Sequence, residues 1–273
     1  MQKNENQQEL SALLESVIKI VGNAVSIIKD APFCVTEKGG ATDITTSSDL
    51  ACQQYLMQEL GALLPNSGFY CEEGDARERD KEFVWIIDPI DGTMNYSRGI
   101  AECGVSVALR KKEEVILGVV QSIFSPDVYS AVLGGGAYLN GKPISVSSNG
   151  FESSLLCTAM SLYKKDYAKI CGDIIYETYM QCNDVRRFGS CAIELCYLAA
   201  GKCDLYFEIR VFPWDYAAAY LILSEAGGIV RGLGDKKLEL NRPTVVVAAN
   251  NAENYERLSR IVNKYLKKTP YEE

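Results

Sequence analysis

The residues best suited to chemistry lie in one short segment, WIIDPIDGTMNY. We expect a buried strand to end at Asp88, because Pro89 cannot donate a ladder hydrogen bond. Asp91 follows three residues later, so both carboxylates can enter one pocket. Gly92 permits a sharp turn, and Thr93 can begin a helix whose first amides attract phosphate. The segment therefore predicts a metal and phosphate site, although an isolated motif of this kind more often forms only a strand, a turn and a cap.

Further acidic residues lie where other elements begin or end. Glu72 and Glu73 follow the apolar segment FYC, which predicts a short strand. Asp215 precedes an apolar helix in PWDYAAAYLILSEAGG, and Asp49 lies near the start of an earlier helix. Taken singly, each acid is explained as solvated surface or as a helix cap. Taken with Asp88 and Asp91, Glu72 and Asp215 have the layout of a two- or three-metal phosphoryl-transfer site.

Composition narrows the chemistry. The chain has 273 residues and no histidine, which excludes histidine bases, Ser-His-Asp triads and histidine-ligated zinc. Carboxylate and carbonyl ligands favour a hard cation, with magnesium first. The ten cysteines are scattered through apolar segments without a CxxC pair, which indicates buried reduced thiols. A net charge of −8 argues against a basic face for nucleic acid, so we expect no nucleic-acid partner.

The N-terminus MQKNENQQEL is polar and lacks the features of a secretory signal. We identify no apolar run long enough to span a bilayer. We therefore expect a cytoplasmic protein with no membrane partner.

The elements that must position the acidic residues follow from periodicity. Apolar residues at helical spacing predict a first helix over residues 10–28, and Ser47 or Ser48 is expected to cap a second helix. Between them lies a glycine-rich loop, CVTEKGGATD. Strands are then expected to form a largely antiparallel meander, and GGGAYLNGK has the glycine spacing of a hairpin. The second half mixes strands with helices at residues 164–181, 190–200, 214–226 and 251–267.

Taken together, these segments resemble the inositol monophosphatase family, which belongs to the sugar-phosphatase superfamily with fructose bisphosphatase. The most specific parts are DPIDGT followed by Asn95 and Tyr96, and WDYAAAYLILSEAGG downstream. The resemblance implies an α+β fold, a layered αβαβα sandwich with the active site between two halves. We expect a metal-binding half with a large antiparallel sheet at residues 1–150, and a half with a smaller mixed sheet at residues 151–273.

The resemblance also implies ligands for two or three Mg²⁺ ions. Glu72, Asp88 and the Ile90 carbonyl would hold one ion. Asp88, Asp91 and Asp215 would hold a second. Glu72 would also contribute to a third, weaker site, and occupation of the second position by lithium would inhibit the enzyme.

The same resemblance implies the roles that surround the metals. The Gly92 and Thr93 amides would bind the substrate phosphate, and Thr93 with Asp49 would orient and deprotonate a metal-activated water. Lys38, on the glycine-rich loop, would approach the metals from above, and Glu73 would have at most a supporting role.

On the alcohol side, the resemblance places Gly189, Ser190 and Glu208 against the substrate. Arg186 and Arg187 lie just upstream and are either ordinary surface charges or a rim that attracts a second phosphate.

The activity implied is magnesium-dependent hydrolysis of a phosphate monoester of a small polyol, with inositol 1-phosphate as the leading candidate. Fructose 1,6-bisphosphatase and the nucleotidase acting on adenosine 3',5'-bisphosphate are the alternatives, and Ile90 with the Asn95-Tyr96 pair favours the inositol branch. A non-catalytic metal-binding regulator on the same fold is the remaining alternative. Family analogy predicts a homodimer.

Overall fold

The computed structural model describes residues 2–31, 34–40, 43–74, 76–160 and 165–267. Its helices are α1 (Gln2–Asp30), α2 (Ser47–Leu63), α3 (Thr93–Ser97), α4 (Ala168–Tyr179), α5 (Cys191–Ala199), α6 (Pro213–Glu225) and α7 (Ala252–Leu266). Its strands are β1 (Val35–Gly40), β2 (Asp43–Thr46), β3 (Gly68–Cys71), β4 (Ala76–Arg77), β5 (Phe83–Asp91), β6 (Gly104–Lys111), β7 (Glu114–Ser122), β8 (Val128–Val132), β9 (Ala137–Leu139), β10 (Lys142–Ile144), β11 (Leu155–Thr158), β12 (Asp184–Arg186), β13 (Leu205–Val211), β14 (Ile229–Arg231) and β15 (Thr244–Ala249).

Within the described residues, the strands form two large sheets and one hairpin. The larger sheet has eight strands in the order β10-β9-β8-β7-β6-β5-β3-β4, and only the β3–β5 pair is parallel. The smaller sheet has five strands in the order β12-β11-β13-β15-β14 and is mixed. Every strand of the larger sheet precedes residue 150 and every strand of the smaller one follows it, while a division into domains at that residue stays a prediction.

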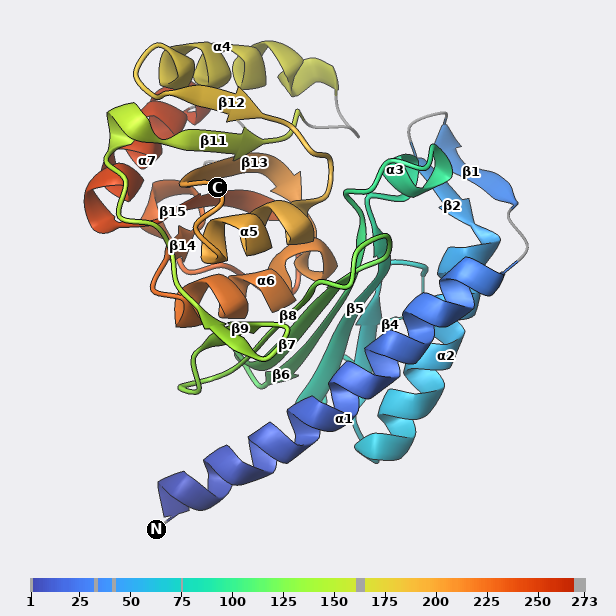
Figure 1. Cartoon of the computed structure of the whole chain (residues 1–273). Coiled ribbons are helices and arrows are strands. Elements are labelled where there is room, and N and C mark those ends of the chain that lie inside the picture. The colour runs from blue at the N-terminus through green and yellow to red at the C-terminus, as the bar shows by residue number, and fades with distance from the viewer. Residues whose placement is uncertain (1, 32–33, 41–42, 75, 161–164, 268–273) are drawn as a thin grey trace.

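The helices and sheets stack in five layers, which confirms the αβαβα sandwich (Figure 1). Helices α1 and α2 cover the outer face of the larger sheet, and α5 and α6 lie between the two sheets. Helices α4 and α7 cover the outer face of the smaller sheet. Apolar side chains fill each of the interfaces, so the sheets are held at a fixed distance across α5 and α6.

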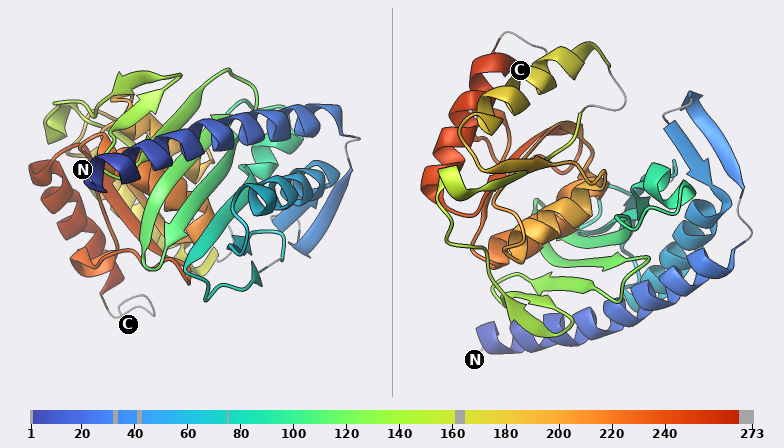
Figure 2. Two further views of the ribbon diagram at one scale, coloured as in Figure 1. Left: turned by 90° about the horizontal axis from the view of Figure 1, so that it is seen from below. Right: turned by 45° about the horizontal axis from the view of Figure 1, so that its top comes forward.

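Helix α1 crosses the outer face of the larger sheet, as both views of Figure 2 show. Val17, Val21, Ala24 and Ile28 are fully buried there at helical spacing. By length and composition alone, the segment Gln7–Asp30 could cross a membrane, contrary to the expectation that no apolar run is long enough. A helix that packs against a core can meet the same criterion, and one face of α1 packs in this way, with 28% of the most apolar stretch buried.

Strand β5 does not end at Asp88, as the sequence had suggested, but runs through Pro89 to Asp91. Its pairing with β6 shifts between these aspartates, with Asp88 opposite Ser106 and Asp91 opposite Gly104. The irregularity accommodates proline, which has no amide hydrogen to donate to the ladder. The shift places two carboxylates at one end of the strand.

The predicted loop at residues 34–43 also differs from the structure, because β1 and β2 pair there as an antiparallel hairpin. Thr46 then caps α2, one residue before the predicted Ser47. Lys38 lies in β1, but its side chain is outside the part of the chain that the structure describes.

Close contact between α6 and the larger sheet depends on Gly118 in β7. A Cβ atom at this position would lie 2.7 Å from the carbonyl oxygen of Ala218 and 3.0 Å from its Cα. We expect Gly118→Ala to lower the free energy of unfolding by about 1–3 kcal/mol, because α6 must move away from the strand. Denaturant titration measures this change.

The matched control is Gly172→Ala in α4, where an added Cβ would meet no atom within 4 Å. It should raise the free energy of unfolding by about 0.5–1 kcal/mol through helix propensity. Equal stability of the two variants would show that the packing of α6 does not require a glycine at position 118.

Candidate active site

A cleft opens where the larger sheet, α5, β13 and α6 meet, so both halves of the chain contribute to it. Most of the predicted site residues line this cleft, and they come from strand ends and helix starts. They are Glu72, Asp88, Ile90, Asp91, Gly92, Thr93, Gly189, Ser190, Glu208 and Asp215.

The centre of the cleft is a cluster of three aspartates. One carboxylate oxygen from each of Asp88, Asp91 and Asp215 lies within 4.8 Å of the others. The irregular end of β5 supplies the first two. Asp215 belongs to the first turn of α6, where its Oδ2 accepts a hydrogen bond of 2.8 Å from the Phe212 amide. Asp215 therefore caps α6, which was the alternative to a functional role, and it also belongs to the cluster.

Burial and mutual repulsion make these carboxylates costly to ionise. Burial raises the pKa of Asp88 well above its usual value, and the charges of Glu72, Asp91 and Asp215 raise it further. Burial likewise raises the pKa of Asp215. The pKa of Asp91 rises to about 6, mainly through burial, against the opposing effect of its hydrogen bond from Ser190. A divalent cation would remove this repulsion, so the donor set fits a hard metal ion.

Glu72 and Ile90 lie beside the cluster for reasons of sheet topology. Strands β3 and β5 run parallel, with Cys71 opposite Ile87, so Glu72 leaves β3 next to Asp88. The two side chains form a hydrogen bond that contributes to the raised pKa of Asp88. The Ile90 carbonyl accepts a hydrogen bond of 3.0 Å from Thr93 Oγ1, and it retains a second lone pair for a cation.

Thr93 connects the cleft to a carboxylate buried behind it. Its Oγ1 lies 3.4 Å from Oδ1 of Asp49, which is fully buried in the first turn of α2. Asp49 also forms a capping box, since its Oδ2 accepts a hydrogen bond of 2.7 Å from the Thr46 amide. The helix cap expected for Asp49 is therefore present, and the same carboxylate remains within reach of Thr93.

The Gly189-Ser190 segment joins the cluster directly. Ser190 Oγ and the Ala192 amide each donate a hydrogen bond of 2.6 Å to Oδ2 of Asp91. Gly189 has a φ of +89°, a conformation that favours glycine. A residue on α5 thus orients an aspartate on β5 across the boundary between the halves.

Glu208 projects from β13 into the same cleft. Its Oε2 accepts a hydrogen bond of 2.5 Å from Tyr206, and burial raises its pKa to about 7. A polyol hydroxyl could donate to the remaining oxygen.

Among the predicted site residues whose side chains the structure describes, two do not line the cleft. The Glu73 amide bonds to Gln53 at 3.1 Å, and its side chain lines a different groove beside α2. Asp49 is reached only through Thr93, as described above.

Other cleft residues escaped sequence reasoning, namely Ile44, Met94, Ala159 and Val211. The structure also gives different surroundings to Arg186 and Arg187, for which the sequence analysis left the same two roles open. Arg186 forms an ion pair of 2.5 Å with Asp184, whereas Arg187 lines the cleft.

Glu194 in α5 is a further residue that the sequence analysis missed. Its side chain is fully buried, and its Oε1 accepts hydrogen bonds from the Phe188 amide at 2.6 Å and the Gly189 amide at 2.9 Å. Asn95 holds the same segment from the other half, donating 2.6 Å to the Phe188 carbonyl. A single acid within the apolar helix CAIELCYLA was the available signal.

The pKa of Glu194 gives a testable pH dependence, because burial raises it to about 8 from an ordinary value of 4.5. Between these values the folded protein retains a proton that the unfolded chain releases, so stability falls as pH rises. We expect Glu194→Gln to make this slope shallower, since the raised pKa values of the cleft carboxylates keep part of it, and the variant should gain on the parent by roughly 2–4 kcal/mol between pH 5 and pH 8. Denaturant titrations of the metal-free proteins measure the difference, and parallel pH profiles would contradict it.

Comparisons with known proteins agree with this geometry. The inositol monophosphatase family model matches residues 6–267. Inositol monophosphatase 2 of Solanum lycopersicum is 34% identical over 224 residues, covering 79% of this chain and 84% of the relative. Nus factor SuhB of Vibrio cholerae is 33% identical over 223 residues, covering 81% of this chain and 84% of that relative.

The solved structure of the Thermotoga maritima IMPase superposes with a TM-score of 0.84 at 28% identity, covering 93% of this chain and 98% of that one. The family model and the structural match both extend over nearly the whole chain. This protein therefore belongs to the inositol monophosphatase family.

Proposed function

We propose that this protein is a magnesium-dependent phosphatase that hydrolyses a phosphate monoester of a small polyol, with inositol 1-phosphate as the leading substrate. The observation that carries the proposal is the convergence of Asp88, Asp91 and Asp215 within 4.8 Å, in a cleft that also contains Glu208. The named relative from tomato supports the substrate class.

The proposed mechanism assigns a task to each part of the cleft. Glu72, Asp88, the Ile90 carbonyl, Asp91 and Asp215 would hold two or three Mg²⁺ ions. Bound magnesium supplies charge neutralisation of the phosphate and lowers the pKa of an attacking water. No covalent enzyme intermediate is needed, which suits a chain without histidine.

The remaining steps belong to the protein. Thr93 Oγ1 orients the attacking water and passes its proton towards Asp49, which lies 3.4 Å away. The Gly92 and Thr93 amides bind the phosphate at the start of α3. Ser190 keeps Asp91 oriented by its 2.6 Å hydrogen bond, so the Asp91 carboxylate does not have to reorient during turnover.

Fructose 1,6-bisphosphate remains a second candidate substrate, because Arg187 lines the cleft as an exposed cation. Its charge would offset the repulsion between Glu208 and a second phosphate. The adenosine 3',5'-bisphosphate nucleotidase has no comparable support. A non-catalytic regulator is also a candidate, since several relatives carry the name Nus factor SuhB. Release of phosphate from a generic ester separates an enzyme from such a regulator.

Homodimer formation, a cytoplasmic location, lithium inhibition and the absence of nucleic-acid and membrane partners stay predictions. The supporting roles suggested for Lys38 and Glu73 also stay predictions.

Metal dependence tests the mechanism. Chelation should abolish phosphate release and added Mg²⁺ should restore it, because the cluster requires a cation. Asp91→Asn should lower kcat by about 100- to 1,000-fold, since it removes a ligand charge in the cleft. The control is Asp173→Asn on α4, outside the cleft, which should retain full activity. Undiminished turnover in excess chelator would rule the mechanism out.

Substitution of Glu208 tests the polyol assignment. Glu208→Gln should raise KM for inositol 1-phosphate by about 10- to 100-fold, which corresponds to one charged hydrogen bond. Its kcat on a small generic ester should hardly change, because Glu208 is not one of the three aspartates that form the cluster. Equal losses on both substrates would show that Glu208 supports the metal site instead.

A further inference from the structure

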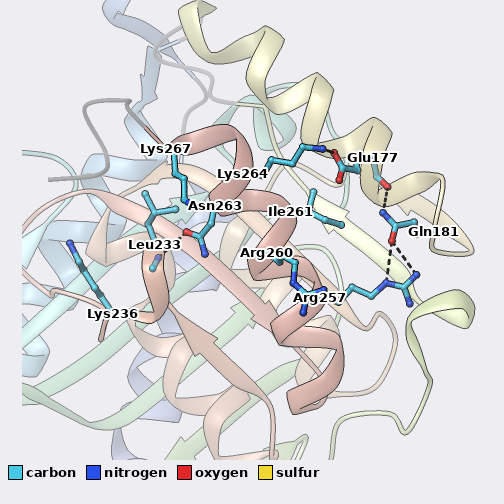
Figure 3. Close-up of a pocket in the computed structure, with 11 residues that line it drawn as sticks. Glu177, Gln181, Leu233, Lys236, Arg257, Arg260, Ile261, Asn263, Lys264 and Lys267 are labelled. Atoms are coloured by element: carbon cyan, nitrogen blue, oxygen red, sulfur yellow. Dashed lines mark hydrogen bonds and ion pairs between the residues drawn. The ribbon is translucent and has the colours of Figure 1, made fainter.

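A second hollow lies on the far side of the smaller sheet from α5 and α6. It has a volume of about 930 Å³ and is open to solvent. Helix α7 forms its floor, α4 forms one wall, and the turn η3 (Leu233–Asp235) forms the other (Figure 3). Because α4 and α7 cover the outer face of this sheet, the groove is separate from the acidic cleft.

Cationic side chains line the groove along its length. Arg257, Arg260 and Lys264 lie at spacings of three or four residues on one face of α7, and Lys267 follows three residues later as its C-cap. From the first to the last, this row spans about 15 Å at the rise of an α-helix. Lys236 adds a fifth positive charge from the opposite wall.

The groove has little negative charge to balance this row. Glu177 is the one acidic residue among the described residues that line it. Its Oε2 already accepts hydrogen bonds from Lys264 at 2.6 Å and from Tyr265 at 2.5 Å. Arg257 is likewise held in place, by Gln181 at 3.1 Å and by Glu152 at 2.5 Å.

The other three cations lack such partners. In the described part of the chain, the side chains of Lys236, Arg260 and Lys267 form no ion pair or hydrogen bond, and all three are exposed. Favourable interaction with a helix C-terminus accounts for Lys264 and Lys267. It does not account for Arg260, in the middle of α7, or for Lys236, which comes from another element.

This concentration of charge is unexpected in a chain whose net charge is −8. A row of about 15 Å is longer than a single phosphate, and none of the described residues that line the groove has an aromatic ring to stack on a base. We propose that the groove is a second anion-binding site, which takes a soluble small molecule carrying several phosphates. Arg257 and Lys264 are held in place by their partners, and Lys236, Arg260 and Lys267 are free to contact the phosphates of the ligand.

The test uses inorganic tripolyphosphate as the probe and isothermal titration calorimetry as the measurement. The full chain is kept in chelator at about 50 mM salt, so that exposed charges are weakly screened and the metal-free aspartate cluster repels anions. We expect saturable binding that weakens steeply as salt increases. The triple variant Lys236→Gln, Arg260→Gln, Lys267→Gln should bind about tenfold more weakly or worse, and it breaks no internal ion pair.

The matched control carries Lys19→Gln, Lys29→Gln and Lys142→Gln, which change the net charge equally on exposed positions outside the groove. It should bind tripolyphosphate like the parent, as should Arg187→Gln in the acidic cleft. Equal loss of tripolyphosphate affinity in both triple variants would show that binding depends only on the net charge, which would contradict the proposed site. Loss in Arg187→Gln would place the anion in the cleft, and binding of a single-stranded oligonucleotide without tripolyphosphate would exclude a small-molecule site.

Discussion

Repulsion between buried carboxylates is the constraint on which the site depends. Asp88, Asp91 and Asp215 lie within 4.8 Å of one another, with Glu72 beside them. Such a cluster costs free energy in the folded protein, because desolvation and like charge both oppose ionisation. The fold must therefore force these side chains together with elements whose own packing is strong. The cost is recovered when a cation binds, so the same arrangement that lowers stability creates affinity for metal.

The elements that impose this arrangement are fixed by their neighbours. Asp88 and Asp91 sit at the end of β5, which is buried between α2 on one face and α6 on the other. Asp215 is set by the start of α6, whose approach to β7 requires Gly118. Hydrogen bonds from Ser190 to Asp91 and from Asn95 to Phe188 then join the two halves. The cleft between the halves is for this reason held by direct polar contacts on both sides.

Residue types and local spacing predicted the acidic centre, whereas long-range placement determined the rest. DPIDGT and WDYAAAYLILSEAGG carried enough information to select the cluster, because each motif is contiguous in the chain. Local sequence predicted the end of β5 wrongly. Pro89 suggested a strand end, but an irregular pairing with β6 lets the strand continue past it. The glycines at residues 39 and 40 suggested a loop where β1 and β2 pair. Arg186 and Arg187 are adjacent and chemically identical, so only the direction of each side chain could show which one faces the cleft.

Under the proposed function, metal binding would be coupled to proton release, and the coupling would extend to Glu208. A cation bound by Asp91, whose pKa is about 6, favours the ionised carboxylate and displaces its proton. The negative charge of Asp91 also contributes to the raised pKa of Glu208, about 7. A cation that neutralises Asp91 therefore lowers the pKa of Glu208 and favours its charged form near neutral pH. The carboxylate that would recognise the polyol would thus become a stronger acceptor with the metal site filled, so the proposed substrate recognition would depend on metal occupancy through charge alone.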